Sequence, residues 1–415
     1  MKTDLATDPA MDERIRLLQV KVAGQPSGQL LQQSGFEYRY LQADPDQPVV
    51  GLLMPPTRLT WQDGALFPVM DQNLPEGDLF NRLRQQFPKQ AMTAMRLLAL
   101  IGDNGIGRLG YRVPTSQAPA RAVPISRQTL LRMPFTAQVF DDLVNAYLAT
   151  GIGVAGMQPK IMVPDRATIP IPNLIVKTAG TGYPGLAANE YLCMTAAARA
   201  GIDTAQVELS DDGQLLLVER FDLDANGLRL GFEDVASLMG LRVRDTLSER
   251  KYHGSYQRVA ELLSMITGNR HDLQRFYEQL AFSIMVGNGD AHLKNFGVLY
   301  YGVADGIRLA PMFDVVTTRI YRYQRSPGGP ALEDHTMALR LWSGKAQRSK
   351  TYPLPEELCR FGRDVCAVRD PKAPLERITQ AMIDTLHAAA RDTRIPSDLL
   401  AQMRPVWENG ARYAQ

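Results

Sequence analysis

The run VGNGDAHLKNFGVLY, residues 286–300, decides how the rest of this chain is interpreted. It places the acid Asp290 five residues before the amide Asn295, with His292 and Lys294 between them and an apolar run after them. A carboxylate can accept the proton of an alcohol, and an amide oxygen can bind a hard cation such as Mg²⁺. Such a D-x-x-x-x-N pattern is common by chance, so its meaning depends on matching motifs elsewhere in the chain.

Length and composition describe an ordinary globular chain. At 415 residues it should divide into two or three domains, and 45% hydrophobic with 22% charged residues is typical of a folded protein. A formal net charge of +2, with acids and bases interspersed, argues against a dedicated nucleic-acid binder acting alone. No apolar run reaches the length of about 18 residues that a membrane-spanning helix needs, and the polar, acidic N-terminus does not have the pattern of a secretory signal. Three cysteines fit reduced core thiols better than disulfides or a zinc site, so we expect a cytoplasmic protein that does not bind a membrane.

Residues 14–115 predict a small α+β domain that follows a disordered lead at residues 1–13. The run LLQVKVAGQPSGQLLQQ, residues 17–33, alternates around a Gly-Gln-Pro turn and predicts a β-hairpin, and FEYRYL, residues 36–41, predicts another strand. Helices are predicted at residues 74–87 and in AMRLLALI, residues 94–101, which is followed by a Gly-rich turn and a strand. The SQAPARAVPIS stretch then predicts a linker at residues 116–135.

Residues 136–230 predict a lobe built around a glycine-rich loop. A helix at residues 136–150 leads into GIGVAGMQPKIMVP, where Gly151, Gly153 and Gly156 spell G-x-G-x-x-G, and the later strand LIVK ends at Lys177. Glycines let backbone N–H groups approach a phosphate closely. A dinucleotide-binding fold would need a helix directly after the glycines, whereas a β-type run follows here. The order of strand, loop, strand and lysine therefore predicts the N-terminal lobe of a kinase.

The helix predicted from AANEYLCMTAAARAGI, residues 187–202, carries Glu190 in its first half. Glu190 either pairs with Lys177, as a glutamate and a lysine do in kinases, or is a solvated acid favoured by the helix dipole. The strands AQVELS and LLLVERFD follow. The second strand suits a hinge, whose backbone at Glu219, Arg220 and Phe221 would face the edge of an adenine.

Residues 231–415 predict a mostly helical lobe. Helices are expected in FEDVASLMGL, SYQRVAELLSMITG and HDLQRFYEQLAFSIMVGN, and the last of these leads into the Asp290 loop. After Asn295 a hairpin around residues 304–306 ends at Asp314, where kinases place a second metal ligand. The predicted fold class is α+β: a protein-kinase-like bilobal fold with a mostly helical C-lobe and a small N-terminal α+β domain.

Taken in order, these motifs resemble those of HipA-type serine/threonine kinases, the toxins of bacterial type II toxin–antitoxin modules. The motifs are GVAGMQPKIMV, LIVK, NEYLCMTAAARAGI, LLVERFD, GNGDAHLKNFGVLY and LAPMFDVV. The stretches VAGQPSGQL, FEYRYL and LPEG are similar to the family's N-terminal domain. The resemblance covers most of the chain, and the motifs are specific as a set although each is weak alone.

The resemblance implies an ATP- and Mg²⁺-dependent kinase that phosphorylates a serine or threonine of another protein. It implies that Lys177 contacts the ATP phosphates beside the loop glycines, and that Glu219 and Phe221 hold the adenine through their main chain. Asp290 would be the catalytic base, and Lys294 would place a positive charge near the transferred phosphoryl group.

The same resemblance implies metal ligands and partners. Asn295 and Asp314 would bind Mg²⁺, and His292 would either line the phosphate site or only shape the loop. A small helix-turn-helix antitoxin of the HipB type would be the partner, with DNA contacted only through it. The substrate would be a translation component, with an aminoacyl-tRNA synthetase as one candidate and arrest of translation as the outcome.

One position departs from the family pattern. Family members usually carry a serine three residues before the glycine that matches Gly156, and phosphorylation of that serine by the kinase itself ejects the loop. This chain has Gly153 there and so has no hydroxyl to modify. We therefore expect this self-limiting switch to be absent, with Thr150 as the nearest replacement acceptor.

Two other functions remain open from the sequence. The chain could be mainly a co-repressor, docked on an antitoxin at operator DNA with vestigial kinase activity, although the intact set of Lys177, Asp290, Asn295 and Asp314 argues against this. It could also be a small-molecule phosphotransferase of the aminoglycoside or choline type, which shares the catalytic spacing. Such enzymes tend to carry acidic pockets for cationic substrates, whereas the C-terminal region here is mixed in charge.

Overall fold

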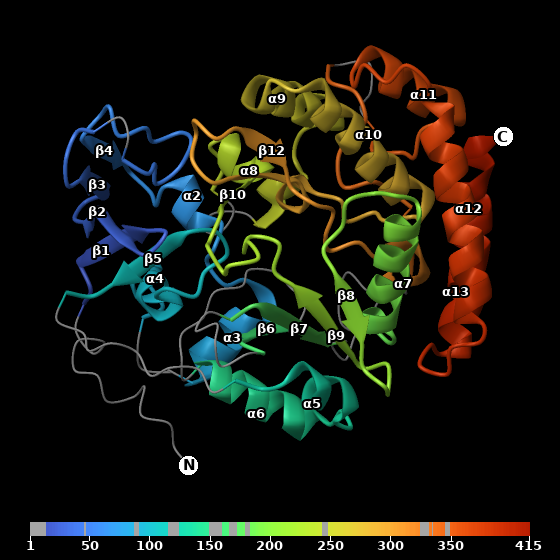
Figure 1. Cartoon of the computed structure of the whole chain (residues 1–415), viewed down its shortest axis with the longest axis horizontal. Coiled ribbons are helices and arrows are strands. Elements are labelled where there is room, and N and C mark those ends of the chain that lie inside the picture. Colours follow the sequence, from blue (N-terminus) through green and yellow to red (C-terminus); the bar gives the residue numbers. More distant parts are fainter. Residues whose placement is uncertain are drawn as a thin grey trace. The chain divides into compact units, whose positions relative to one another are not determined.

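The computed structural model describes residues 14–44, 47–86, 91–114, 124–148, 160–165, 172–178, 183–242, 248–323, 332–333, 335–344 and 349–415 (Figure 1). The predicted lead at residues 1–13 lies outside these ranges. The chain forms two compact units, each assembled from three segments. The first unit comprises Met1–Lys177, Glu219–Arg250 and Gly297–Ile307, and the second comprises Thr178–Val218, Lys251–Phe296 and Arg308–Gln415.

A five-stranded antiparallel sheet forms the N-terminal part of the first unit. Its strands lie in the order β4-β3-β2-β1-β5, with bounds β1 Leu17–Val22, β2 Gln25–Gln32, β3 Phe36–Tyr40, β4 Thr60–Asp63 and β5 Leu109–Arg112. The β1–β2 turn has two left-handed residues, Ala23 at φ +48° and Gly24 at φ +82°, which matches the twist of a tight hairpin. Alternate side chains of β1, Leu18, Val20 and Val22, are at most 1% exposed, so this face of the sheet meets the core. The predicted hairpin and the predicted strand at β3 are confirmed.

The helices of the first unit are short, and some of them begin after a residue whose side chain caps the helix. Their bounds are α2 Pro68–Asp71, α3 Gly77–Gln86, α4 Ala94–Ile101, α5 Arg127–Arg132, α6 Ala137–Leu148 and α8 Val235–Leu238. The Thr93 side chain caps α4 by accepting a hydrogen bond from the Arg96 N–H, and Gly102 ends the helix at φ +55°. The helices predicted at residues 74–87, 94–101 and 136–150 are present as α3, α4 and α6. Helix α5 forms within the segment predicted as a linker.

Two antiparallel strand pairs complete the first unit. Strands β6 Lys160–Val163 and β7 Leu174–Thr178 pair with Lys160 opposite Lys177, and β10 Gly231–Asp234 pairs with β11 Gly297–Tyr300. The sequence predicted helix from Phe232 onward, which is wrong for β10, because the helix begins only at Val235 with Asp234 as its cap. The strand forms because it pairs with β11. Since β11 comes much later in the chain, local periodicity cannot indicate this pairing.

The second unit is mostly helical. Its helices are α7 Leu186–Arg199, α9 Tyr256–Thr267, α10 Arg270–Met285, α11 Pro355–Asp364, α12 Lys372–Ala389 and α13 Ser397–Ala411. Short 3-10 turns are η2 Ser248–Tyr252, η3 Leu293–Asn295, η4 Thr318–Ile320 and η5 Arg412–Ala414, and the remaining strands are β8 Val207–Leu209, β9 Leu215–Glu219, β12 Ile307–Leu309, β13 Arg322–Tyr323 and β14 Leu332–Glu333. Phe276, Leu280 and Phe282 of α10 are fully buried, so this helix forms the centre of a core with α9, α12 and α13 (Figure 1). The second strand predicted around the hinge ends at Glu219, earlier than expected.

The three cysteines, Cys193, Cys359 and Cys366, are buried free thiols, as predicted for core residues. Burial raises the pKa of the Cys193 thiol to about 12, so this group packs as a neutral side chain. Within the described ranges, none of the helices combines the length and the apolar character that crossing a bilayer requires.

Candidate active site

The catalytic loop predicted around Asp290 follows directly from the end of α10. Gly287 turns the chain at φ +70°, and a Cβ atom there would lie 2.7 Å from a side chain of α13, so the turn requires glycine. The buried Asn288 side chain accepts a hydrogen bond from the Asp290 N–H at 3.0 Å. The Gly289 N–H donates to the Thr318 hydroxyl at 2.7 Å. The loop is therefore held by its own side chains and by the segment that follows residue 314.

Asp290 is exposed, and its Oδ1 atom accepts a hydrogen bond from the Tyr252 hydroxyl at 2.7 Å. The Asp290 carbonyl accepts a hydrogen bond from the His292 N–H at 2.7 Å. The His292 side chain is buried, and its ring meets the Tyr252 ring edge-on with centroids 5.3 Å apart. Sequence reasoning did not identify Tyr252, which lies 38 residues before Asp290 and belongs to no motif. An exposed carboxylate held in this way can accept the proton of an incoming hydroxyl.

The structure brings Asn295 and Asp314 together. The Asn295 Nδ2 group donates to the Asp314 carbonyl at 3.3 Å, and Lys294 lies half-buried on the same 3-10 turn as Asn295. The Asn295 Oδ1 atom is buried and accepts no hydrogen bond from the described residues. Such an oxygen costs about 1–3 kcal/mol unless something else binds it. Asp314 is half-buried at φ +59°, a left-handed conformation that is costly for a residue with a Cβ atom and is common at functional sites.

Helix α7 carries Glu190 and is tied to the segment that follows Asp314. The Thr317 N–H donates to Asn189 Oδ1 at 2.8 Å, and Asn189 Nδ2 donates to the Thr317 carbonyl at 3.1 Å. The Trp407 indole N–H donates to the Thr317 hydroxyl at 2.8 Å, and these three side chains are at most 1% exposed. The paired, buried hydrogen bonds fix the backbone just after Asp314. Glu190 is 1% exposed, which excludes the solvated acid considered from the sequence.

In the first unit, the predicted phosphate ligand Lys177 lies on β7 and is buried. The residue opposite it is Lys160 of β6, which is also buried. Residues directly opposite each other in an antiparallel pair share one face of the sheet, and like charges there repel each other. Lys160 and Lys177 therefore share one face of this strand pair. Sequence reasoning identified Lys177 and missed Lys160, whose only local signal was a charge at the head of an apolar strand.

The predicted hinge residues Glu219 and Phe221 lie at the end of β9 and just after it. The Glu219 carboxylate pairs with Arg127 of α5 at 2.5 Å, and the Phe221 ring packs edge-on against an aromatic ring of β10. Between them, the Arg220 N–H donates to the Asn173 carbonyl at 3.0 Å, so this N–H is already used within the protein. Hydrogen bonds to an adenine would thus have to come from the main chain of the flanking residues.

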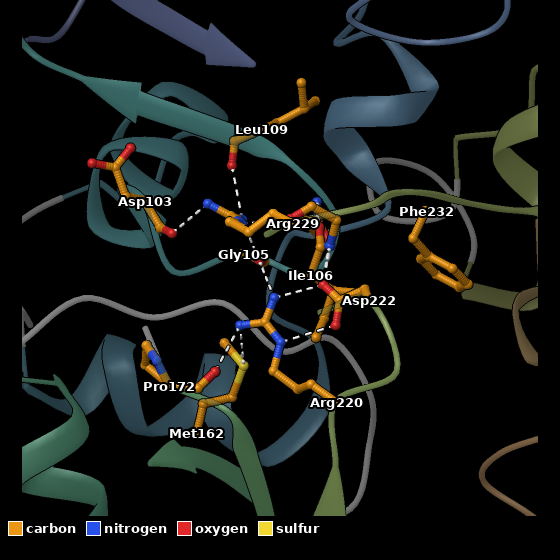
Figure 2. A network of polar contacts seen from close by, with 12 residues as sticks. Asp103, Gly105, Ile106, Leu109, Met162, Pro172, Arg220, Asp222, Arg229 and Phe232 are labelled. Carbon is orange, nitrogen blue, oxygen red and sulfur yellow. Dashed lines mark hydrogen bonds and ion pairs between the residues drawn. The ribbon is translucent and has the colours of Figure 1, made fainter. Parts of the chain in front are cut away.

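A buried polar network lies behind this hinge (Figure 2). Arg220 forms a two-point ion pair with Asp222, with Nη2–Oδ2 at 2.6 Å and Nε–Oδ1 at 3.0 Å, and neither side chain is more than 2% exposed. The Asp222 Oδ2 atom also accepts the Gly107 N–H at 2.6 Å. Arg229 donates to main-chain carbonyls of the Gly-rich turn after α4, at Asp103, Gly105 and Gly107, and to the carbonyl of Leu109, the first residue of β5. The network fixes this turn to the segment that follows β9.

Burial and pairing set the charges of this network. Burial acts to raise the pKa of Asp222, but the ion pair and hydrogen bonds from Arg220 outweigh it and hold that pKa below its ordinary value. Burial, together with the nearby Arg220 charge, lowers the pKa of Arg229 to about 10. Asp222 and Arg229 are therefore both charged at neutral pH.

The predicted site residues divide between the two units. Gly151, Gly153 and Gly156 and the replacement acceptor Thr150 lie outside the described residues, and their roles stay predictions. The first unit holds three of the other predicted residues, Lys177, Glu219 and Phe221. The second holds the remaining six, Glu190, Asp290, His292, Lys294, Asn295 and Asp314.

Three features define the class of this protein: a strand pair with a buried lysine, a helix with a buried glutamate, and an Asp290–Asn295 loop that meets Asp314. The protein has an α+β kinase-like fold. The family described as HipA-like C-terminal domain matches residues 152–391, and the family described as HipA N-terminal domain matches residues 18–112. The first match covers more than half of the chain. The chain therefore belongs to the HipA family.

Two individual relatives are described as putative kinases. The chain is 30% identical over 250 residues to "Putative kinase Y4mE" of Sinorhizobium fredii, which covers 54% of this chain and 58% of the relative. It is 31% identical over 162 residues to "Putative kinase Y4dM" of the same organism, which covers 35% of this chain and 38% of the relative. The chain thus spans less than two thirds of either relative.

A solved structure confirms the predicted fold class. A chain of the Shewanella oneidensis complex described as toxin–antitoxin system HipA, HipB and its operator DNA matches with a TM-score of 0.67 over 96% of both chains, at 18% identity. At this identity the likeness shows the fold alone.

Proposed function

We propose that this chain is a protein kinase that uses ATP and Mg²⁺ to phosphorylate a serine or threonine of another protein. The observation that carries the proposal is the contact between Asn295 and Asp314, five and 24 residues after Asp290. It combines a buried amide oxygen that lacks a donor among the described residues with a carboxylate on a left-handed backbone. A structural contact alone would explain neither feature, whereas a cation-binding pair beside a base would explain both.

The donor set at Asn295 and Asp314 fits Mg²⁺. Both residues offer oxygen atoms, which hard cations prefer, and Mg²⁺ commonly takes only one or two protein ligands beside substrate phosphates and water. The described residues contain no cluster of three His, Cys, Asp or Glu side chains suited to a metal, so an all-protein cage is not the expected type of site. When bound, Mg²⁺ would supply positive charge against the phosphates of the nucleotide.

The protein's own residues would position the reactants and accept the proton. Asp290 would take the proton of the substrate hydroxyl while the hydroxyl oxygen bonds to the γ-phosphorus and the bond from that phosphorus to the leaving ADP breaks. Lys294 would offset charge on the transferred group. Lys177 and Lys160 would bind phosphate oxygens from one face of their strand pair. Phosphoryl transfer needs little covalent help, so positioning and charge would account for most of the rate.

We propose that the partner is a small helix-turn-helix antitoxin of the HipB type. The similar S. oneidensis structure is described as a complex of HipA, HipB and operator DNA. By this similarity the chain would act as the toxin of a toxin–antitoxin module and would reach DNA only through the antitoxin. Aminoacyl-tRNA synthetases are the first protein substrates to test, following the family resemblance.

A transfer assay with γ-labelled ATP and a bacterial lysate tests the activity. The wild-type chain should label a protein band. Asp290→Asn should lower the rate about 10²–10⁴-fold and leave ATP affinity nearly unchanged, because the base acts on the acceptor hydroxyl and not on the nucleotide. Asn295→Ala should instead raise the Mg²⁺ concentration needed for half-maximal rate, because it removes a proposed oxygen ligand.

Asp384→Asn is the matched control, since Asp384 is an exposed aspartate of α12, and its rate should equal that of the wild type. An Asp290→Asn variant that keeps more than a tenth of the wild-type rate would show that another acid is the base. Label in small molecules alone would indicate a small-molecule phosphotransferase. No label at all, with operator DNA bound in the presence of antitoxin, would indicate a co-repressor.

A further inference from the structure

Tyr252 lies beside the proposed base without belonging to any motif in the sequence. Its hydroxyl donates a hydrogen bond to Oδ1 of Asp290 at 2.7 Å. A phenol that donates to an ionised carboxylate makes a charge-assisted hydrogen bond, which is stronger and more directional than one between neutral groups. On an exposed aspartate, such a bond selects one side-chain orientation from the several that would otherwise be populated.

Three neighbouring side chains hold the Tyr252 ring. The ring of His292 meets it edge-on, with an interplanar angle of 77°. The ammonium groups of Lys251 and Lys350 lie 5.4 Å and 5.8 Å from the ring centroid, within the range of cation–π attraction. The Lys350 ammonium also donates to the Tyr252 carbonyl at 2.9 Å. Movement of the phenol away from Asp290 would disturb the three contacts of the ring together.

A second tyrosine attaches the same segment to the next residue of the loop. Tyr256, the first residue of α9, is 1% exposed, and its hydroxyl donates to the Ala291 carbonyl at 2.9 Å. Ser255 caps α9 by accepting the Arg258 N–H, so the segment enters the helix in a defined conformation. The start of α9 therefore supports the catalytic loop at two successive residues, 290 and 291.

We propose that Tyr252 is a positioning residue, which holds the Asp290 carboxylate in the orientation needed to accept the proton of the substrate hydroxyl. The inference rests on the proposed function, in which Asp290 is the base. A plug displaced by substrate would instead require the Tyr252 hydroxyl to leave the carboxylate. The contacts of its ring oppose that movement.

Tyr252→Phe tests the proposal, because it removes one oxygen and keeps the ring between His292 and the two lysines. In the assay with γ-labelled ATP, kcat should fall about 10- to 100-fold, the effect expected from losing one hydrogen bond to a charged group. The KM values for ATP and for the protein acceptor should stay within about twofold. Tyr277→Phe is the matched control, since the Tyr277 hydroxyl donates to the Pro371 carbonyl at 3.1 Å, and it should keep the wild-type kcat.

A double-mutant cycle separates positioning from a general structural effect. In the Asp290→Asn background, Tyr252→Phe should lower kcat by less than about twofold further, because it acts through the carboxylate that is already gone. Multiplicative losses, or a Tyr252→Phe variant with wild-type kcat, would overturn the proposal. Phosphate found on Tyr252 by mass spectrometry would also overturn the proposal. So would a Tyr252→Phe variant with a lowered KM for the acceptor and a raised kcat/KM. Transfer that depends on Asp290 but not on Tyr252 overturns this inference alone, whereas a wild-type chain that transfers no phosphate overturns the proposed function with it.

Discussion

Replacing Asp222 with asparagine should destabilise the first unit far more than the same change at the surface. Asp222 Oδ2 accepts the Gly107 N–H and Arg220 Nη2, both at 2.6 Å, and Oδ1 accepts Arg220 Nε at 3.0 Å (Figure 2). In Asp222→Asn an amide group would turn its own N–H atoms toward these donors. Arg220, whose side chain is 0% exposed, would lose its counter-charge. Removing one partner of a buried ion pair costs about 3–5 kcal/mol.

Thermal unfolding and hydrogen exchange measure this loss. The midpoint of the transition that includes the first unit should fall by roughly 10 °C, and the Gly107 amide should exchange faster. Asp392→Asn is the matched control, because Asp392 forms the same two-point pair with Arg394, at 2.7 Å and 2.9 Å, with side chains 24% and 29% exposed. Water screens this second pair, so its loss should cost only about 0–1 kcal/mol.

The difference between wild type and Asp222→Asn should also depend on pH. Burial pushes the pKa of Asp222 upward, but Arg220 outweighs it, so the folded-state pKa lies below the unfolded value of 3.8. A lowered folded-state pKa means that the carboxylate stabilises the fold above the unfolded pKa and that this stability is lost as pH falls through the folded pKa. The difference in thermal unfolding midpoint between wild type and Asp222→Asn should therefore be largest near neutral pH and become smaller in acid. Equal losses for the two variants, or a gap that widens in acid, would refute the reasoning.

Two further variants test other buried polar groups. Asn189→Leu leaves the Thr317 N–H and carbonyl without their side-chain partner in a dry site, so thermal unfolding of the second unit should show a loss of about 2–4 kcal/mol, and an unchanged midpoint would contradict the pairing. Glu233 accepts the Tyr300 hydroxyl at 2.6 Å, and burial raises its pKa from 4.5 to about 7. Its raised folded-state pKa means that stability is full below about pH 4.5 and is lost as pH rises to about 7, by on the order of 3 kcal/mol. Glu233→Gln should remove this loss of stability with rising pH, as seen in thermal unfolding midpoints measured from pH 4.5 to 8. If the midpoints of wild type and Glu233→Gln change in parallel with pH, Glu233 is not a buried, protonated group.

Elements defined by neighbouring residues were predictable from the sequence. The β1–β2 hairpin follows from alternating side chains and a turn that accepts left-handed backbone at Gly24. Helix α4 follows from an apolar face between Thr93 as cap and Gly102 as end. Each of these signals lies within one turn or one strand of the structure that it specifies, so local propensity and sterics suffice.

Elements that depend on distant partners were predicted wrongly or missed. The segment at Phe232 has the composition of a helix start, yet it forms β10 because β11 supplies its hydrogen bonds. Lys160 was not identified from the sequence, and its place opposite Lys177 shows that both share one buried face. Arg220 was considered only for its backbone, whereas its side chain is the centre of a buried network.

The sequence by itself determined the order of the motifs and the chemical groups available to the site, because Asp290, Lys294 and Asn295 lie within a single short loop. Only the tertiary structure decided which groups support that loop. Tyr252 reaches Asp290 across 38 residues, and Asn189 reaches the segment after Asp314 across 128 residues. A polar side chain has many candidate partners along an unfolded chain, and packing of α7, α9 and α10 around the loop selects one of them. Burial then strongly favours that pairing. An unpaired polar group in the core costs more free energy than a hydrogen bond contributes at the surface.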